Sequence, residues 1–198
     1  MTYEVFAIQL VKRFFNRYGI TYASSGKLSS WMFRYFNFRL KHLPLGTRDV
    51  FVSNELKLKM ASHPSALEFL EIAEATTKGK DLNPYQSVGL SDSGKHDDLY
   101  NDWGIHHLHL TSIRDKHPKY EYFVARSDYL LFAIFKESAA YFIDIYPHSE
   151  KPLWGKRDLL SVVQKNWEYL IAGSEMRGMI QPDLSDQDIE LARKAGVV

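Results

Sequence analysis

Histidine is concentrated in one short segment of the chain. His106, His107 and His109 occupy three of four successive positions in the segment DWGIHHLHL, residues 102–110. The ordinary pKa of histidine lies closest to neutrality, so such a cluster can transfer protons, bind a metal ion or pair with phosphate. The segment therefore indicates chemistry without fixing which chemistry.

Metal-free cleavage of RNA is one chemistry that these residues could perform. It needs a base for the 2′-hydroxyl, an acid for the leaving oxygen and a cation on the phosphate. Arg126 lies at a predicted strand turn and His148 at the end of the last predicted strand. The alternative is that Arg126 pairs with Asp128 or Asp144 and that the histidines bond to backbone. The candidate catalytic residues are His107, His109, Arg126 and His148.

A metal site is a second interpretation of the same histidines. His107 and His109 are two positions apart on a predicted strand, so both would lie on one face and could chelate an ion, with His148 and Asp144 completing the site. The pair alone is a weak motif, and no H-E-x-x-H sequence accompanies it. We therefore expect no metal and no other cofactor, and a metal-dependent hydrolase stays as the less favoured alternative.

Composition excludes several other classes. The chain contains no cysteine, which rules out disulfides, thiolate metal sites and cysteine nucleophiles. It lacks the G-x-S-x-G and G-x-G-x-x-G motifs of serine hydrolases and dehydrogenases. It also has no long apolar run, so we expect neither a membrane span nor a signal peptide, and a cytoplasmic location.

The amino-terminal third is basic and has helical periodicity. Residues 1–60 contain ten Lys or Arg and three acidic residues. Apolar spacing predicts helices over residues 2–18 with Gly19 as the cap, from Ser29 or Ser30 to about Leu43, and over 65–77. Aromatic and basic residues alternate on the second helix and could stack with RNA, although aromatic stripes at this spacing are also typical of a core. Residues 49–58 fit an edge strand or a loop, and residues 78–95 form a connector.

From Gly104 the periodicity changes to two. Strands are predicted at residues 105–110, 119–125, 129–135 and 139–146, and the short turns between them indicate an antiparallel meander. Residues 105, 107 and 109 should share one face, and 106, 108 and 110 the other. The last two strands are almost wholly apolar, so both of their faces should be covered by helices. Two more helices are predicted, one after residue 147 and one from Ser185 to about Ala195.

These elements predict an α+β fold. A helical N-terminal region, residues 1–80, would precede an antiparallel β-meander sheet flanked by helices, residues 96–198, with both parts packed as one unit.

Residues 125–148 resemble the RelE/ParE/YoeB group of toxin ribonucleases. The likeness consists of a strand with an arginine, the apolar strand 129–135, a charged turn, the apolar strand 141–146 and a histidine directly after it. The resemblance implies a sheet packed on helices and metal-independent cleavage of messenger RNA. It also implies that Arg126 is similar to the phosphate-binding arginine of the group and His148 to its terminal catalytic histidine.

The sequence thus predicts a toxin-like, metal-independent endoribonuclease that acts on RNA by His/Arg acid–base catalysis, with RNA and a protein antitoxin as partners. The alternative is a non-catalytic protein-interaction component of a phage or defence system. In that case the histidines would be structural and the basic helices would bind a partner.

Overall fold

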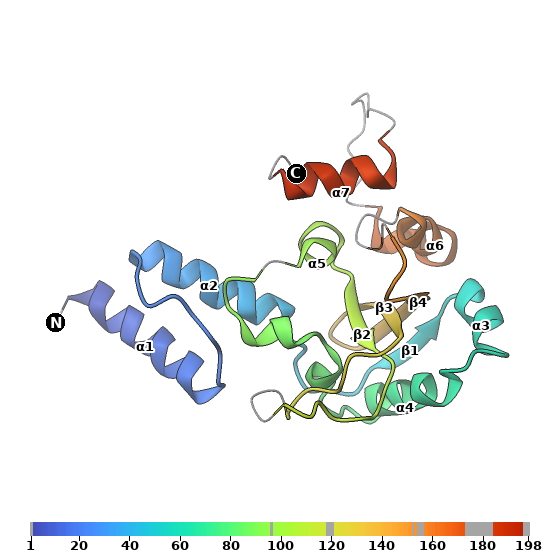
Figure 1. The fold of residues 1–198 in the computed structure, drawn as a ribbon, viewed down its shortest axis with the longest axis horizontal. Coiled ribbons are helices and arrows are strands. Elements are labelled where there is room, and N and C mark those ends of the chain that lie inside the picture. Colours follow the sequence, from blue (N-terminus) through green and yellow to red (C-terminus); the bar gives the residue numbers. More distant parts are fainter. Residues whose placement is uncertain are drawn as a thin grey trace.

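The chain forms a four-stranded sheet between two layers of helices, with a pair of helices at one end (Figure 1). The computed structural model describes residues 2–95, 97–117, 121–151, 153, 157–172 and 184–195. The α-helices are α1 (Tyr3–Arg17), α2 (Leu28–Lys41), α3 (Asn54–Met60), α4 (Ala66–Thr77), α5 (Asp98–Trp103), α6 (Asp158–Trp167) and α7 (Asp186–Lys194). The strands are β1 (Asp49–Val52), β2 (His106–His109), β3 (Tyr129–Phe135) and β4 (Ala139–Pro147), and 3₁₀ turns cover Asn83–Tyr85, Val88–Ser91 and Glu168–Leu170.

The sheet is mixed, so the prediction of a purely antiparallel meander is wrong. Its order is β1-β4-β3-β2: β2, β3 and β4 pair antiparallel, whereas β1 pairs parallel with β4, from Asp49 opposite Ala139 to Val52 opposite Phe142. The N-terminal region is therefore not wholly helical. β1 ends at Val52, and the residues after it form α3 instead of continuing the strand. Ser53 caps α3 by accepting a hydrogen bond from the Leu56 N–H.

The strand predicted at residues 119–125 is also wrong for its described part. Residues 121–125 contain only an isolated bridge between Val124 and Arg114. The Val124 and Ala125 N–H groups donate to the carbonyls of Pro84 and Ile113, which lie in loops. Phe123 and Val124 are buried outside the sheet, and Phe123 packs with side chains of α1 and α2. Residues 118–120 lie outside the described part.

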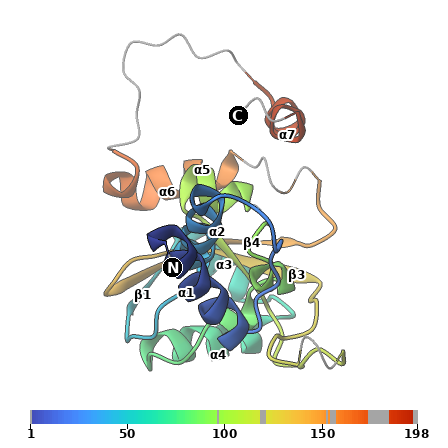
Figure 2. The same cartoon turned by 90° about the vertical axis from the view of Figure 1, so that its left-hand side faces the viewer.

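Helices cover both faces of β3 and β4, as the apolar sequences of these strands predict. One face packs Leu130, Phe132 and Ile134 against α6 and the start of α5, and the other packs Leu131 and Ala133 against α3 and α4. Figure 2 shows α5 and α6 on one side of the sheet and α4 on the other. Side chains on both faces are thereby removed from water, which favours a rigid support for the strand ends.

The helix pair α1–α2 has its own apolar cluster. Val11 and Phe15 of α1 pack on Trp31 and Phe38 of α2, and this cluster extends to Phe123 in the loop before β3. Gly19 lies at φ +64° directly after α1, as expected of a glycine that ends a helix. The predicted start of α2 is wrong: it begins at Leu28, and its N-cap Lys27 makes no side-chain capping bond.

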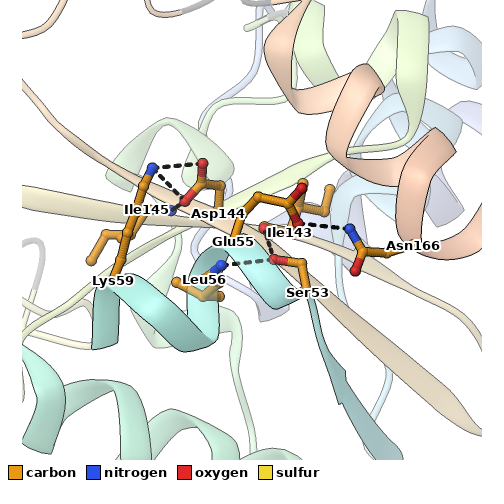
Figure 3. Close-up of polar contacts among 8 residues, drawn as sticks. All are labelled: Ser53, Glu55, Leu56, Lys59, Ile143, Asp144, Ile145 and Asn166. Carbon is orange, nitrogen blue, oxygen red and sulfur yellow. Dashed lines mark hydrogen bonds and ion pairs between the residues drawn. The ribbon is translucent and has the colours of Figure 1, made fainter. Parts of the chain in front are cut away.

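An ion pair between exposed Lys59 and buried Asp144 joins α3 to an irregularity in β4. The register between β3 and β4 shifts at Phe132 and Ala133, opposite Asp144. Asp144 is 2% exposed, and both its oxygens lie 2.7 Å from Lys59 Nζ while Oδ1 accepts from the Ile145 N–H at 2.8 Å (Figure 3). The carboxylate is thus paired and hydrogen-bonded where the regular strand pairing is interrupted.

Two further contacts hold α3 in the same place. Ser53 Oγ donates to the Ile143 carbonyl at 2.6 Å, and Asn166 of α6 donates to Glu55 Oε2 at 2.8 Å (Figure 3). The start of α3 is therefore bonded to β4 and to a helix of the opposite layer. The hydrogen bond from Asn166 lowers the pKa of the Glu55 carboxyl, with a smaller opposing effect of burial.

We predict that Lys59→Met lowers the free energy of unfolding by about 2 to 3 kcal/mol, because it leaves the Asp144 carboxylate buried without its cation. Urea unfolding followed by circular dichroism measures the change. Lys57→Met is the matched control, since Lys57 is an exposed lysine of the same helix. Equal effects of the two substitutions would contradict a stabilising role for the ion pair.

Candidate functional site

Three of the four predicted catalytic residues meet at one end of the sheet. Arg126 Nη2 lies 2.8 Å from His148 Nδ1, and the rings of His109 and His148 stack with centroids 5.7 Å apart and planes 15° apart. Antiparallel pairing explains the convergence, because it brings the end of β2, the segment before β3 and the end of β4 to the same edge. We refer to His109, Arg126 and His148 as the His–Arg cluster.

The turn at residues 126–128 locks these strand ends together. The Ser127 N–H donates to His109 Nδ1 at 3.2 Å, and Ser127 Oγ accepts from the Leu110 N–H at 3.0 Å. The Ser127 hydroxyl donates to the Tyr129 carbonyl, and the His148 N–H donates to the Asp128 carbonyl at 2.7 Å. The turn is thus bonded to β2 on one side and to the residue after β4 on the other.

The hydrogen bonds define the protonation of both stacked histidines. A guanidinium has only donors, so His148 Nδ1 accepts from Arg126 and its ring proton lies on Nε2. His109 Nδ1 likewise accepts from a backbone N–H. Burial lowers the pKa of His109 to about 3, with added effects of His107, His148 and Arg126. Burial and then Arg126 lower the pKa of His148 as well. Both imidazoles are neutral at pH 7.

Solvent reaches the His–Arg cluster from the Arg126 side. Arg126 is exposed, His148 is half-buried and His109 is 7% exposed, so solvent exposure decreases from Arg126 through His148 to His109. A ligand approaching from water meets the guanidinium first and the imidazole of His148 next. An exposed cation beside a neutral nitrogen base suits an anionic substrate with a proton to lose.

His107, the fourth predicted residue, lies deeper along the same face of β2. Its Nδ1 is 3.5 Å from Asp97 Oδ2, and its side chain is 12% exposed. Burial lowers the pKa of His107, while the nearby carboxylate of Asp97 opposes this shift. His107 lowers the pKa of His109 electrostatically. The charged group beside His107 is the Asp97 carboxylate, whereas Arg126 contacts His148.

His106 faces the opposite side of β2, as the alternation predicts. It is 5% exposed, and its ring packs 4.6 Å from the ring of Tyr100 and 5.5 Å from that of Phe135. Its Nδ1 lies 3.4 Å from Gln86 Oε1, and burial lowers its pKa to about 3. These contacts give His106 a packing role.

The alternatives raised by the sequence have different outcomes. Asp144 pairs with Lys59, so it is not the partner of Arg126, whose side chain bonds to His148. Within the described ranges, no group of three or more histidine, cysteine, aspartate or glutamate side chains is placed to hold a metal ion. The sequence interpretation missed Ser127, whose place in the predicted turn was the only signal for it, and Asp97, which caps α5, a helix that the sequence analysis did not predict.

A separate cavity of about 1130 Å³ lies between α5, α6 and α7. Its lining mixes an aromatic ring, cations and acids, among them Trp103, Lys136, Asp158 and the pair of Arg157 and Asp186, whose Nε and Oδ1 are 3.2 Å apart. The four predicted catalytic residues are not among its lining residues.

Comparison with known proteins found no matching family model, no matching curated protein and no matching solved structure. Among the helices that the structure describes, none has the length and apolar character needed to cross a membrane. The chemistry of the His–Arg cluster therefore has to be argued from its own geometry.

We predict that the fold loses stability as the pH falls from 6.5. The pKa values of His106 and His109 are about 3 in the folded protein, below the ordinary 6.5, so the unfolded chain binds protons that the folded chain does not. Above pH 6.5 the two histidines do not reduce the free energy of unfolding. As the pH falls from 6.5 towards 3, each of them lowers it by about 1.4 kcal/mol per pH unit.

Urea unfolding between about pH 5 and 6.5 isolates this effect, because most carboxylates stay ionised there. His106→Gln should reduce the slope of stability against pH. A wild-type stability that is flat over this range would contradict the burial of neutral histidines.

Proposed function

We propose that the protein is a metal-independent endoribonuclease in which Arg126 binds the scissile phosphate and His148 is the base. The observation that carries the proposal is the 2.8 Å contact between an exposed guanidinium and the Nδ1 of a neutral imidazole. Such a pair places a fixed positive charge and a proton acceptor within the span of one phosphodiester and its 2′-hydroxyl.

Substrate binding would itself prepare the base. A phosphodiester offers two anionic oxygens to the planar fork of donors on Arg126, and it competes with His148 for Nη2. Once Arg126 turns to the phosphate, Nδ1 of His148 loses its donor and its lone pair becomes available. The hydrogen bond seen without substrate thus keeps the base occupied until an anion is present.

The chemical step is an in-line attack within the RNA. The 2′-oxygen forms a bond to phosphorus while the bond from phosphorus to the 5′-oxygen breaks, and the 2′-hydroxyl proton passes to His148 Nδ1. The leaving 5′-oxygen takes a proton from solvent at the open side of the cluster. The products are a 2′,3′-cyclic phosphate and a 5′-hydroxyl, and Arg126 stabilises the added charge on the phosphorane.

We assign His109 a positioning role. With a pKa of about 3 it carries no proton to donate at pH 7, and its Nδ1 is occupied by the Ser127 N–H. Its ring stacks on that of His148 and limits the directions in which His148 can turn. His107 lies behind it, next to Asp97, and contributes to the local electrostatics.

The resemblance of residues 125–148 to the RelE/ParE/YoeB group is in line with this proposal, because by position Arg126 and His148 are similar to its phosphate-binding arginine and terminal catalytic histidine. On this proposal RNA is the substrate, the protein acts in the cytoplasm and a protein antitoxin is the partner that restrains it.

We predict that Arg126→Ala and His148→Ala each reduce RNA cleavage by about 10²- to 10⁴-fold while the melting temperature stays nearly unchanged. Neither side chain is fully buried, so truncation creates little cavity. Single-turnover cleavage of labelled single-stranded RNA, with EDTA present, measures the rate. His117→Ala is the control for loss of an exposed histidine.

Wild-type activity in both variants, or no cleavage by the wild type with or without ribosomes, would overturn the nuclease assignment. Unfolding of either variant would instead show that the residue is structural.

We predict that kcat/KM rises with pH below 6.5 and is level above it, because the base must be neutral and the pKa of His148 is lowered. Arg126→Gln should raise the pKa of His148 towards its ordinary value, since the substitution removes a nearby cation. NMR titration of His148 in the two proteins measures this shift without depending on activity. An unchanged pKa would contradict the coupling of the two residues.

A further inference from the structure

The outer side of the α1–α2 pair exposes large apolar side chains. Leu10 of α1 is 48% exposed, and Phe36 and Leu40 of α2 are 52% and 63% exposed. Tyr18, directly after α1, is 54% exposed. Single exposed apolar residues are ordinary on a protein surface, but a contiguous group of them is typical of a binding surface.

Ring contacts show that the group is contiguous across both helices. Tyr18 lies 4.7 Å from Phe14, Phe14 lies 5.1 Å from Tyr35, and Tyr35 lies 5.6 Å from Phe36. Leu10 lies one helical turn before Phe14 on α1, and Leu40 lies one turn after Phe36 on α2, so each shares a helix face with a member of this row. We call this surface the α1–α2 strip: Leu10, Phe14, Tyr18, Tyr35, Phe36 and Leu40.

The surroundings of the α1–α2 strip are strongly basic. Residues 2–43 contain one acidic residue, Glu4, and seven basic ones: Lys12, Arg13, Arg17, Lys27, Arg34, Arg39 and Lys41. Arg34 and Lys41 are engaged within the fold, since both donate to backbone carbonyls. Arg13, Arg17 and Arg39 are exposed, and none of them forms an ion pair with another residue in the described part of the chain.

This charge decides between two kinds of protein occupant. Two copies of the strip packed face to face would bring their arginines together without carboxylates to oppose them, which disfavours self-association. An amphipathic helix with acidic residues beside its apolar stripe would satisfy both features: its stripe would pack between α1 and α2, and its carboxylates would meet Arg13, Arg17 and Arg39.

The same surface is a poor platform for RNA bases. Two of its members are leucines, and Phe14 and Tyr35 meet edge to face at 77°, so they pack on each other instead of presenting parallel faces for stacking.

We propose that the α1–α2 strip binds an acidic amphipathic helix of a partner protein. This surface is independent of the His–Arg cluster, so the partner would bind whether or not the protein cleaves RNA. The interaction would bury the leucine and phenylalanine side chains and neutralise the exposed arginines, and added salt should weaken it.

A labelled synthetic helix tests the proposal. The probe has leucine along one stripe and glutamate on both flanks, and fluorescence anisotropy with the full-length protein measures its dissociation constant. A second probe has lysine in place of every glutamate. We expect the glutamate probe to bind at least about tenfold more tightly than the lysine probe.

Leu40→Glu, and the double variant Arg13→Glu/Arg17→Glu, should each weaken binding by at least about tenfold. Leu67→Glu is the matched control, because Leu67 is a 74% exposed leucine on α4, and it should bind like the wild type.

Equal affinity for the two probes, or no loss of binding in Leu40→Glu, would overturn the proposal. So would an absence of binding of the glutamate probe, whether or not the protein binds RNA or vesicles containing phosphatidylserine or self-associates.

Discussion

The site depends on the hydrogen bonding of one turn. Ser127 binds the end of β2 through His109 and Leu110, while the adjacent Asp128 carbonyl accepts from the His148 N–H after β4. These bonds hold three separate segments at one corner of the sheet. The sheet can serve as their support because its two central strands are covered on both faces, so the strand ends are fixed by packing as well as by backbone pairing. A small change in this turn would therefore move every member of the His–Arg cluster at once.

Burial and charge act together on the histidines of this corner. Burial removes water from His109 and His148, and Arg126 adds a fixed positive charge, so both effects favour the neutral imidazole. Neutrality has a cost at low pH, when the folded state has to exclude protons that the unfolded chain accepts. It also gives a base that is already deprotonated at pH 7. The same physical arrangement thus explains an acid-sensitive fold and places a neutral imidazole beside a guanidinium, which are the two groups that the proposed mechanism uses.

The sequence predicted the elements whose periodicity is undisturbed, namely α1, α4, β3, β4 and α6, and it predicted the two faces of β2. It did not predict the parallel pairing of β1, because alternation of apolar residues shows that a strand is present but not which direction its neighbour takes. Residues 121–125 resemble a strand in sequence because they include apolar residues, but Phe123 and Val124 are buried outside the sheet. Arg126 and His148 were selected from residue type and position, whereas Ser127 was not, since its role comes from backbone contacts between segments distant in sequence.

The α1–α2 pair provides a second surface, which is apolar and surrounded by basic residues and shares no residue with the His–Arg cluster. The proposed function depends on the transfer of a proton from a 2′-hydroxyl to His148. The most direct test identifies the ends of the RNA fragments produced with EDTA present, using a substrate with a single 2′-deoxy nucleotide at the cleaved position as a comparison. Attack by the 2′-oxygen predicts 2′,3′-cyclic phosphate and 5′-hydroxyl ends, and no cleavage at the deoxy position. Fragments with 5′-phosphate and 3′-hydroxyl ends, or cleavage at the deoxy position, would contradict it.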